Sequence, residues 1–427
     1  MPSDSSSPLH ILVFEPRLEG HYSDYIRHLV QYAHRQSVPI KLTFLVHPDF
    51  QARFWDAIKA ECEASHECVE LIPFGPREHA LCLHKGLPQG IRSFFQWFTM
   101  MKYLRRTGAV HGHFLYIDTL QLAFALKLRV PKGRILSGIL FRPTVHYDQL
   151  WQSPTDFGQH IRNLRKTVLY KGMLNHPALS AVFSLDPYFA GYASKSFKQG
   201  SKVQALPEPG LFPEDLVTYR PSDTVACDIP GDRTCFLLFG GLAARKGVLQ
   251  VLEAVEMLDS KIASQTAIVF AGKLQNDIRT EFEEQFHQLT TDTPELWIHL
   301  EDRYINPAEI TDLIIRCDVV LAPYQHHVGS SNVLLWAAGA QKPVIIQEYG
   351  LIGALAREHK LGIVIDTTQP QAIADAIQAC VEGDVTDFGD PKSMQQFADL
   401  RTPKQFAKTI FNGIINCLHS DKSSKGA

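Results

Sequence analysis

Short apolar runs and longer amphipathic segments alternate along this chain. The run "ILVFEP" at 11–16 is apolar enough for a buried strand, and an amphipathic segment from Tyr22 to about Tyr32 follows it. "IKLTFLV" and "AVHGHFL" predict two further strands, and the apolar segment "IRSFFQWFTMMKYLRR" between them predicts a helix. Strands that alternate with helices indicate βαβ units, so a parallel sheet covered by helices is expected.

The alternation stops around residues 206–230, which are rich in proline and aspartate and lack periodicity, as a linker is. It then resumes, because "CFLLFGG", "TAIVFAG", "DVVLAPY" and "KPVIIQ" predict strands with helical segments between them. The expected fold class is α/β, with two Rossmann-like domains that face each other across a cleft. The predicted parts are an N-terminal domain at 1–212, a linker at 213–232, a second domain at 233–400, a C-terminal helix at 401–419 that packs back toward the first domain, and a disordered tail at 420–427.

Composition narrows the class of protein. The chain has 427 residues, of which 45% are hydrophobic and 20% charged, with a net charge of −3, so nothing points to a nucleic-acid partner. Eight cysteines without CxxC spacing, and a start without an export signal, indicate reduced thiols in a cytoplasmic protein. No apolar run reaches the roughly 18 residues that a membrane span requires. No GxGxxG follows the first strand, which argues against a dinucleotide-dependent dehydrogenase.

A glycine turn with two cations lies in "FGGLAARKG". Gly240 and Gly241 are expected to end a strand, and Arg245, Lys246 and Gly247 to begin a helix. Two cations at a helix N-terminus make a phosphate site, because the free amides and the helix dipole add to their charge. A turn with two solvated cations explains the same residues.

A second anion site is predicted in "HHVGSSN". Gly329 lets the backbone approach a ligand closely. Ser330 or Ser331 is expected to cap a helix that starts near Asn332 and to leave its amides directed at an anion. Capping without a ligand is the alternative.

Two histidines, His111 and His113, lie two apart at a predicted strand end and therefore point the same way. No third ligand follows at metal spacing, so hydrogen bonding is favoured over a metal site. Gly20, next to His21, follows the first strand and serves a tight turn or a close approach to substrate.

Two charged residues follow other predicted strands. Arg142 and Glu348 are placed on the cleft side, and solvated surface positions are the alternative for both. The helix at 92–106 combines many apolar residues with terminal cations. It is either a core helix of the first domain or a peripheral contact with the inner face of a membrane.

Taken together, these segments resemble the retaining glycosyltransferases of family 4, which have the GT-B fold. "FLLFGGLAARKGVLQVLEA" resembles the family's strand–GRxxxxKG–helix element, and "AVHGHF" resembles its "VVHxH" strand end. "INPAEITDLIIRCDVVLAPY" and "WAAGAQKPVIIQEYGLIG" resemble the segments that flank the donor loop, and "VFSLDPYF" resembles the segment before the interdomain crossing. The order and spacing agree over most of the chain.

The resemblance implies a transferase that moves a hexose-type sugar from a nucleotide-diphosphate donor to an acceptor hydroxyl, with retention and without a metal or cofactor. The acceptor is expected to be a glycan or a lipid-linked molecule bound by the N-terminal domain. The diphosphate is expected on Lys246, Arg245 and the amides of 329–331, next to the turn glycines Gly240 and Gly241. His113 is expected beside the reacting sugar, with Lys246 as the second catalytic residue.

The sequence departs from the family at three positions. Aligned through Lys342 and Pro343, the two glutamates of the donor loop are replaced by Val328 and Trp336, and the arginine after the first turn glycine is Gly241. Neither Val nor Trp accepts a hydrogen bond, and each lost charge-assisted bond costs about 1.5–3 kcal/mol unless another group replaces it. Ser330, Ser331 and Asn332 are the expected replacements on the sugar side, and Glu348 on the ribose side. A catalytically inactive binding or scaffold subunit with the same fold is the alternative.

Overall fold

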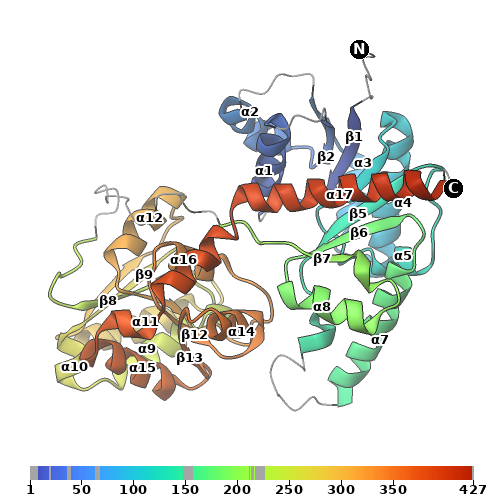
Figure 1. Cartoon of the computed structure of the whole chain (residues 1–427). Coiled ribbons are helices and arrows are strands. Elements are labelled where there is room, and N and C mark those ends of the chain that lie inside the picture. The colour runs from blue at the N-terminus through green and yellow to red at the C-terminus, as the bar shows by residue number, and fades with distance from the viewer. Residues whose placement is uncertain are drawn as a thin grey trace. The chain divides into compact units, whose positions relative to one another are not determined.

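The computed structural model describes residues 8–18, 21–35, 40–62, 68–147, 157–210, 212, 216 and 227–425. The chain divides into two units, each built on its own parallel sheet (Figure 1). Unit 1 comprises residues 1–146, 154–208 and 403–427, and unit 2 comprises 147–153 and 209–402. Most of the predicted linker at 213–232 lies outside the described residues.

The sheet of unit 1 has seven parallel strands in the order β3-β2-β1-β4-β5-β6-β7. The strands are β1 (Leu9–Glu15), β2 (Ile40–Val46), β3 (Val69–Pro73), β4 (His111–Phe114), β5 (Ile135–Leu140), β6 (Leu179–Ser184) and β7 (Val203–Ala205). The helices are α1 (Tyr22–His34), the π-helical η1 (Gln51–Trp55), α2 (Asp56–Cys62), α3 (Pro76–Leu83), α4 (Gln89–Thr107), α5 (Gln121–Ala125), η2 (Thr144–His146), α7 (Phe157–Leu174), α8 (Pro187–Ser196), η3 (Gly200–Lys202) and α17 (Pro403–Lys425).

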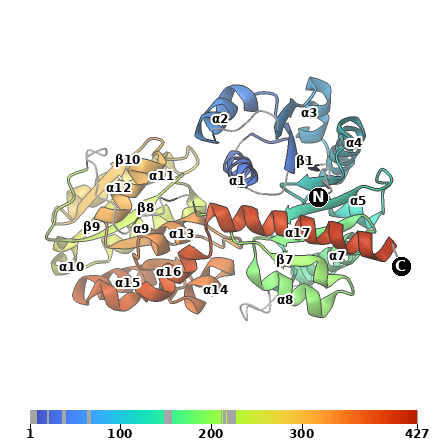
Figure 2. The ribbon, with the colours of Figure 1, turned by 45° about the horizontal axis from the view of Figure 1, so that its top comes forward.

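Helices cover both faces of this sheet, so its strands are apolar on both sides, as expected for a doubly wound sheet. One core lies under α3, α4, α5, α7 and α8, and the other under α1, η1 and α17. Figures 1 and 2 both show α17, in red, running alongside the blue and green elements of unit 1, although it comes last in the chain. It packs against α1 and β6 and continues to Lys425, into the segment for which a disordered tail was predicted.

The sheet of unit 2 has six parallel strands in the order β10-β9-β8-β11-β12-β13. The strands are β8 (Thr234–Phe239), β9 (Thr266–Ala271), β10 (Trp297–Glu301), β11 (Val319–Ala322), β12 (Val344–Gln347) and β13 (Gly362–Ile365). The helices are η5 (Ala244–Lys246), α9 (Val248–Glu256), α10 (Ser260–Ser264), α11 (Arg279–Asp292), α12 (Pro307–Arg316), α13 (Asn332–Gly339), α14 (Gly350–Glu358), α15 (Pro370–Glu382), η6 (Val385–Phe388) and α16 (Pro391–Asp399). The predicted class, two Rossmann-like α/β domains, is confirmed.

Burial decides the role of α4. Trp97, Met100, Met101, Tyr103 and Leu104 are all in the core, as a helix inside the first domain requires. The exposed large apolar side chains of α4 are Ile91, at 44%, and Phe98, at 59%. Most of the apolar surface predicted for a membrane contact at 92–106 is therefore used in packing. No described helix combines the length and the hydropathy of a membrane span.

Candidate functional site

The sheet of unit 2 has a switch point, where the connections of two neighbouring strands run in opposite directions. In the order β10-β9-β8-β11-β12-β13, this switch lies between β8 and β11. Open α/β sheets bind ligands just beyond the carboxyl ends of such a strand pair, because the connecting loops diverge there and leave a crevice. A ligand of unit 2 is therefore expected at the turn after β8 and the loop after β11.

The turn after β8 brings Lys246 back over the strand end. Gly240 has a φ of 93°, and a Cβ at this position would lie 2.7 Å from Lys246 Nζ, so the glycine leaves room for the ammonium. Lys246 is 8% exposed, and its Nζ donates to the carbonyl of Phe239 at 2.6 Å. Within the described part of the chain, no carboxylate lies within ion-pair distance of this ammonium. As an ammonium, Lys246 therefore has two N–H donors beyond the one used by Phe239.

The α-helix after this turn begins later than predicted. Arg245 and Lys246 lie on the short 3-10 turn η5, and α9 starts only at Val248. Gly247 separates the two because it is left-handed, with a φ of 70°, and packs against the carbonyl of Pro323. Arg245 is exposed, and its own carbonyl accepts the amide of Gln325 at 2.9 Å. The turn after β8 is therefore tied to the loop after β11.

That second loop carries the predicted cap. Ser331 is the N-cap of α13 and accepts the amide of Val333 at 3.3 Å, so the predicted capping is confirmed. The Tyr324 hydroxyl lies 2.7 Å from Ser331 Oγ, and the Tyr324 ring lies 5.6 Å below Lys246 Nζ. Tyr324 thus joins the cation of one loop to the capped helix N-terminus of the other.

Polar side chains hold the loop after β11 in place. Gln347 is 2% exposed; its side-chain oxygen accepts the amide of His327 at 3.1 Å, and its side-chain NH2 donates to the carbonyls of His327 and Tyr349. Thr367 donates to the carbonyl of Tyr324 at 2.8 Å. His326 adopts a left-handed φ of 51°, a conformation that is uncommon for residues other than glycine. Hydrogen bonds from Gln347 and Thr367 therefore hold the backbone of this loop.

The remaining predicted residues of this loop differ in their surroundings. Gly329 is buried, and the carbonyl of Ser330 lies 3.0 Å from His327 Nε2. Asn332 has a buried side-chain oxygen that no described group satisfies, and an acceptor of this kind fits a hydroxyl or amide donor of a ligand. Glu348 is exposed and follows the end of β12.

The side chains of Trp336 and Val328, which stand where the resembling family has glutamates, offer no hydrogen-bond acceptor to a ligand. Trp336 is 4% exposed and packs edge-on against Phe212 at 6.0 Å and Phe239 at 6.5 Å between ring centroids. The carbonyl of Val328 accepts the amide of Leu351 at 3.4 Å. Trp336 thus fills an aromatic cluster behind the loop.

In unit 1, the two predicted histidines lie on β4, and His113 is one residue from the end of this strand. His111 begins β4 and His113 is its third residue, because the strand is only 4 residues long. Both rings point to the same face, as predicted, and both lie 2.7 Å from the hydroxyl of Ser137 on β5. Their exposures are 0% and 1%. The pair is therefore buried in unit 1, and the place of His113 beside a reacting sugar stays a prediction.

The other predicted residues of unit 1 lie on the surface or outside the described residues. Gly20 is not among the described residues. His21 is exposed at the start of α1 and stacks on Tyr25 with 6.5 Å between ring centroids. Arg142 is exposed, and its amide donates to Asp118 Oδ1 at 3.0 Å.

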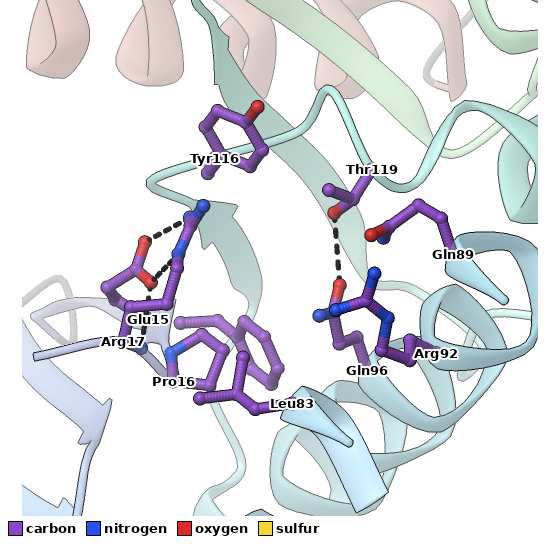
Figure 3. A pocket seen from close by; sticks show the side chains of 10 residues that line it. Glu15, Pro16, Arg17, Leu83, Gln89, Arg92, Gln96, Tyr116 and Thr119 are labelled. Atoms are coloured by element: carbon purple, nitrogen blue, oxygen red, sulfur yellow. Dashed lines mark hydrogen bonds and ion pairs between the residues drawn. The ribbon is translucent and has the colours of Figure 1, made fainter. Parts of the chain in front are cut away.

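Unit 1 has a pocket that the sequence analysis missed. It lies at the switch point of this sheet, between the end of β1 and the loop after β4 (Figure 3). Its cavity measures about 90 Å³. The lining residues are Phe14, Glu15, Pro16, Arg17, Leu83, Gln89, Arg92, Gln96, Tyr116 and Thr119.

One wall of this pocket is a closed ion pair. Glu15, at 1% exposure, accepts Arg17 Nε at 2.7 Å and Nη2 at 2.9 Å. Burial raises the pKa of the Glu15 carboxyl, and the charge and hydrogen bonds of Arg17 oppose this shift. The Arg17 guanidinium lies over the rings of Tyr22 and Tyr116, at 4.3 Å and 4.0 Å. One signal was available in the sequence, since "FEPR" places two opposite charges directly at the end of a buried strand.

A family model matches most of unit 2. Residues 233–383 match the family model of the group 1 glycosyl transferases. The matched region runs from β8 to the end of α15 and so contains the glycine turn, Lys246 and the loop after β11. No match was found among curated protein sequences.

Solved structures share the fold over nearly the whole chain. A glycosyltransferase from Rickettsia africae has a TM-score of 0.65 at 12% identity, covering 97% of this chain and 99% of its own. The Anabaena protein Alr3699/HepE in complex with UDP has a TM-score of 0.62 at 15% identity, covering 96% and 100%. WaaG, a glycosyltransferase involved in lipopolysaccharide biosynthesis, has a TM-score of 0.58 at 15% identity, covering 94% and 98%. These similarities confirm the GT-B architecture of two Rossmann-like domains.

Proposed function

We propose that this protein is a glycosyltransferase that moves a hexose-type sugar from a nucleotide-diphosphate donor to an acceptor hydroxyl, with retention and without a metal ion. The observation that carries the proposal is Lys246, an ammonium that has no carboxylate partner among the described residues and lies over Tyr324 at the switch point of unit 2. The family match over residues 233–383 supports the transfer chemistry. UDP in the Anabaena neighbour supports a nucleotide diphosphate as part of the donor.

The donor phosphates lie, in this proposal, between the two loops of unit 2. Lys246 and Arg245 supply positive charge from the turn after β8, and the amides of 329–331 approach from the capped end of α13. Asn332, with its unsatisfied oxygen, is the proposed contact to a sugar or ribose hydroxyl, and the exposed Glu348 is the proposed second contact on the ribose side.

The reaction follows from this placement of charge. The acceptor oxygen forms a bond to the anomeric carbon on the face from which the phosphate leaves, and the bond from that carbon to the phosphate oxygen breaks. The departing phosphate takes the proton of the acceptor hydroxyl. Negative charge grows on the leaving oxygens, and the fixed ammonium and amides stabilise it without rearranging, which is the largest effect in many enzymes.

A glycan or a lipid-linked molecule is the proposed acceptor, bound by unit 1. We place the protein in the cytoplasm. A peripheral position at the membrane would depend on a lipid-linked acceptor and not on contact through α4. A binding or scaffold subunit is the second candidate, because Val328 and Trp336 offer no acceptor where the family has glutamates.

A nucleotide-sugar panel separates the two candidates. UDP, GDP and ADP, each with their common sugars, are tested by thermal shift and then by release of the nucleotide diphosphate. Binding together with slow donor hydrolysis is the expected result. Binding without release in the presence of candidate acceptors would favour the scaffold, and no binding of any nucleotide would refute the donor site.

Gly240→Ala tests the space beside Lys246. Alanine at a φ of 93° costs about 1–2 kcal/mol, and its Cβ would displace the ammonium, so we expect UDP affinity to fall about tenfold. Isothermal titration with UDP measures the change. Gly231→Ala is the matched control, because a Cβ there meets nothing within 4 Å. Wild-type UDP affinity in a folded Gly240→Ala protein would contradict the assignment.

A further inference from the structure

The pocket of unit 1 occupies the position in its sheet that the donor site occupies in unit 2. The order β3-β2-β1-β4-β5-β6-β7 places the switch between β1 and β4. Glu15 is the last residue of β1, and Tyr116 and Thr119 follow β4, so the pocket opens at the carboxyl ends of the switching strands. A ligand is expected at such a place on physical grounds alone.

Several polar groups of this pocket are held by hydrogen bonds to other residues of unit 1. The Thr119 hydroxyl donates to Gln96 Oε1 at 3.0 Å, and Gln96 Nε2 donates to the carbonyl of Cys82 at 3.0 Å. Glu15 and Arg17 neutralise each other in a bidentate pair. These contacts fix the walls and leave them without net charge.

Arg92 differs from these groups. Its Nε is buried, and among the described residues neither a hydrogen-bond acceptor nor a carboxylate satisfies its guanidinium. Figure 3 shows this guanidinium between Gln89 and Gln96, on the side of the pocket opposite Glu15 and Arg17. A buried donor without an acceptor costs about 1–3 kcal/mol, more when it is charged, and a ligand that supplies the acceptor recovers this energy.

The surroundings of Arg92 favour a negative ligand. The residue lies in the first turn of α4, a helix of 19 residues whose N-terminus has no side-chain cap, so the helix dipole adds to its charge. The one carboxylate of the lining, Glu15, is already neutralised by Arg17. The pocket therefore carries an excess of one positive charge.

The geometry points to a binding site in unit 1 for an anionic group, a carboxylate or a phosphate, held by the guanidinium of Arg92. A cavity of about 90 Å³ accommodates one such group rather than a nucleotide, since sites for whole ligands measure roughly 300–1,000 Å³. Arginine recognises both anions through two parallel hydrogen bonds. The identity of the ligand rests on the proposed function: if the protein is a glycosyltransferase, the anionic group belongs to the acceptor. The acceptor is then an acidic sugar or a phosphorylated sugar.

Binding to the intact protein without any nucleotide tests this site. Glucuronate and glucose 6-phosphate are the two anionic probes, and glucose is the neutral probe of the same ring size. Isothermal titration compares the wild type with Arg92→Met and with Arg105→Met. Arg105→Met is the matched control, because Arg105 is an exposed arginine in the last turn of the same helix.

We expect at least one anionic probe to bind saturably and glucose not to bind. Arg92→Met is expected to lower the affinity for the anion about tenfold or more, whereas Arg105→Met leaves the affinity unchanged. Binding of one anion only identifies the group as a carboxylate or as a phosphate, and either result supports the site.

Three outcomes would overturn the site: no saturable binding of either anion, equal binding of glucose, or equal losses in the two variants. UDP binding, measured on the same samples, reports on unit 2. Loss of the donor proposal and loss of this site are therefore observed separately.

Discussion

Replacing Lys246 by methionine is expected to lower the rate of sugar transfer by about 10²- to 10³-fold. The ammonium lies at the switch point of unit 2, and the proposed reaction develops negative charge on the phosphate next to it. Methionine keeps the buried length of the side chain but removes the charge and the donors. UDP affinity is expected to fall as well, since in the proposed complex Lys246 also contacts the phosphates of the bound donor.

The measurement is release of nucleotide diphosphate from the donor that the panel identifies, at saturating donor. Methionine also leaves the carbonyl of Phe239 without its 2.6 Å donor, so the melting temperature must be measured alongside. Lys261→Met is the control, because Lys261 is an exposed lysine on α10, before β9. An unchanged rate in a well-folded Lys246→Met protein would remove Lys246 from the reaction.

Acidification is expected to destabilise unit 1 through its two buried histidines. Burial lowers the pKa of His111 to about 3, with the neighbouring His113 adding to the shift, and burial lowers the pKa of His113 to about 3. In the unfolded chain both titrate near 6.5. Because the folded pKa is the lower one, the stabilisation is complete above pH 6.5 and is lost as the pH falls from 6.5 toward 3. Between pH 7 and pH 5, each of the two rings is expected to lower the free energy of unfolding by about 2 kcal/mol.

Hydrogen exchange of peptides that cover β1 and β4, corrected for intrinsic exchange rates, measures this loss locally. His111→Gln is expected to remove about half of the pH dependence between pH 7 and pH 5, because one titrating group remains. His34→Gln, at an exposed position on α1, is the control and is expected to behave as the wild type. If His111→Gln and the wild type respond alike to pH, the pair is not the cause.

Local patterns were enough for the strands and for the loop chemistry of unit 2. The turn glycine Gly240, the cation Lys246 and the cap Ser331 belong to short strand–loop–helix segments whose geometry depends on neighbouring residues in the chain. Such segments place their polar groups at strand ends wherever they fold. The start of the α-helix at Val248 instead of at Arg245 was missed, because it depends on the packing of Gly247 against Pro323 from a distant loop.

The pocket of unit 1 could not be found in this way. Its lining comes from β1, α3, α4 and the loop after β4. The relevant property of Arg92 is that its Nε has no acceptor in the described part of the chain, which no spacing reveals. The same limit applies to His113. A histidine near a strand end faces a ligand or the core according to where the strand begins and which residue lies opposite it, here Ser137.

The sequence by itself determined two parallel α/β domains and a candidate phosphate site in the second, because period, turn chemistry and capping act over a few neighbouring residues. Tertiary structure alone decided which charges are neutralised and which are left over. Glu15 and Arg17 close on each other, His111 and His113 turn to Ser137, and Lys246 and Arg92 stay without a carboxylate among the described residues. Neutralisation depends on distances between side chains from separate elements, and those distances exist only once the sheets have formed.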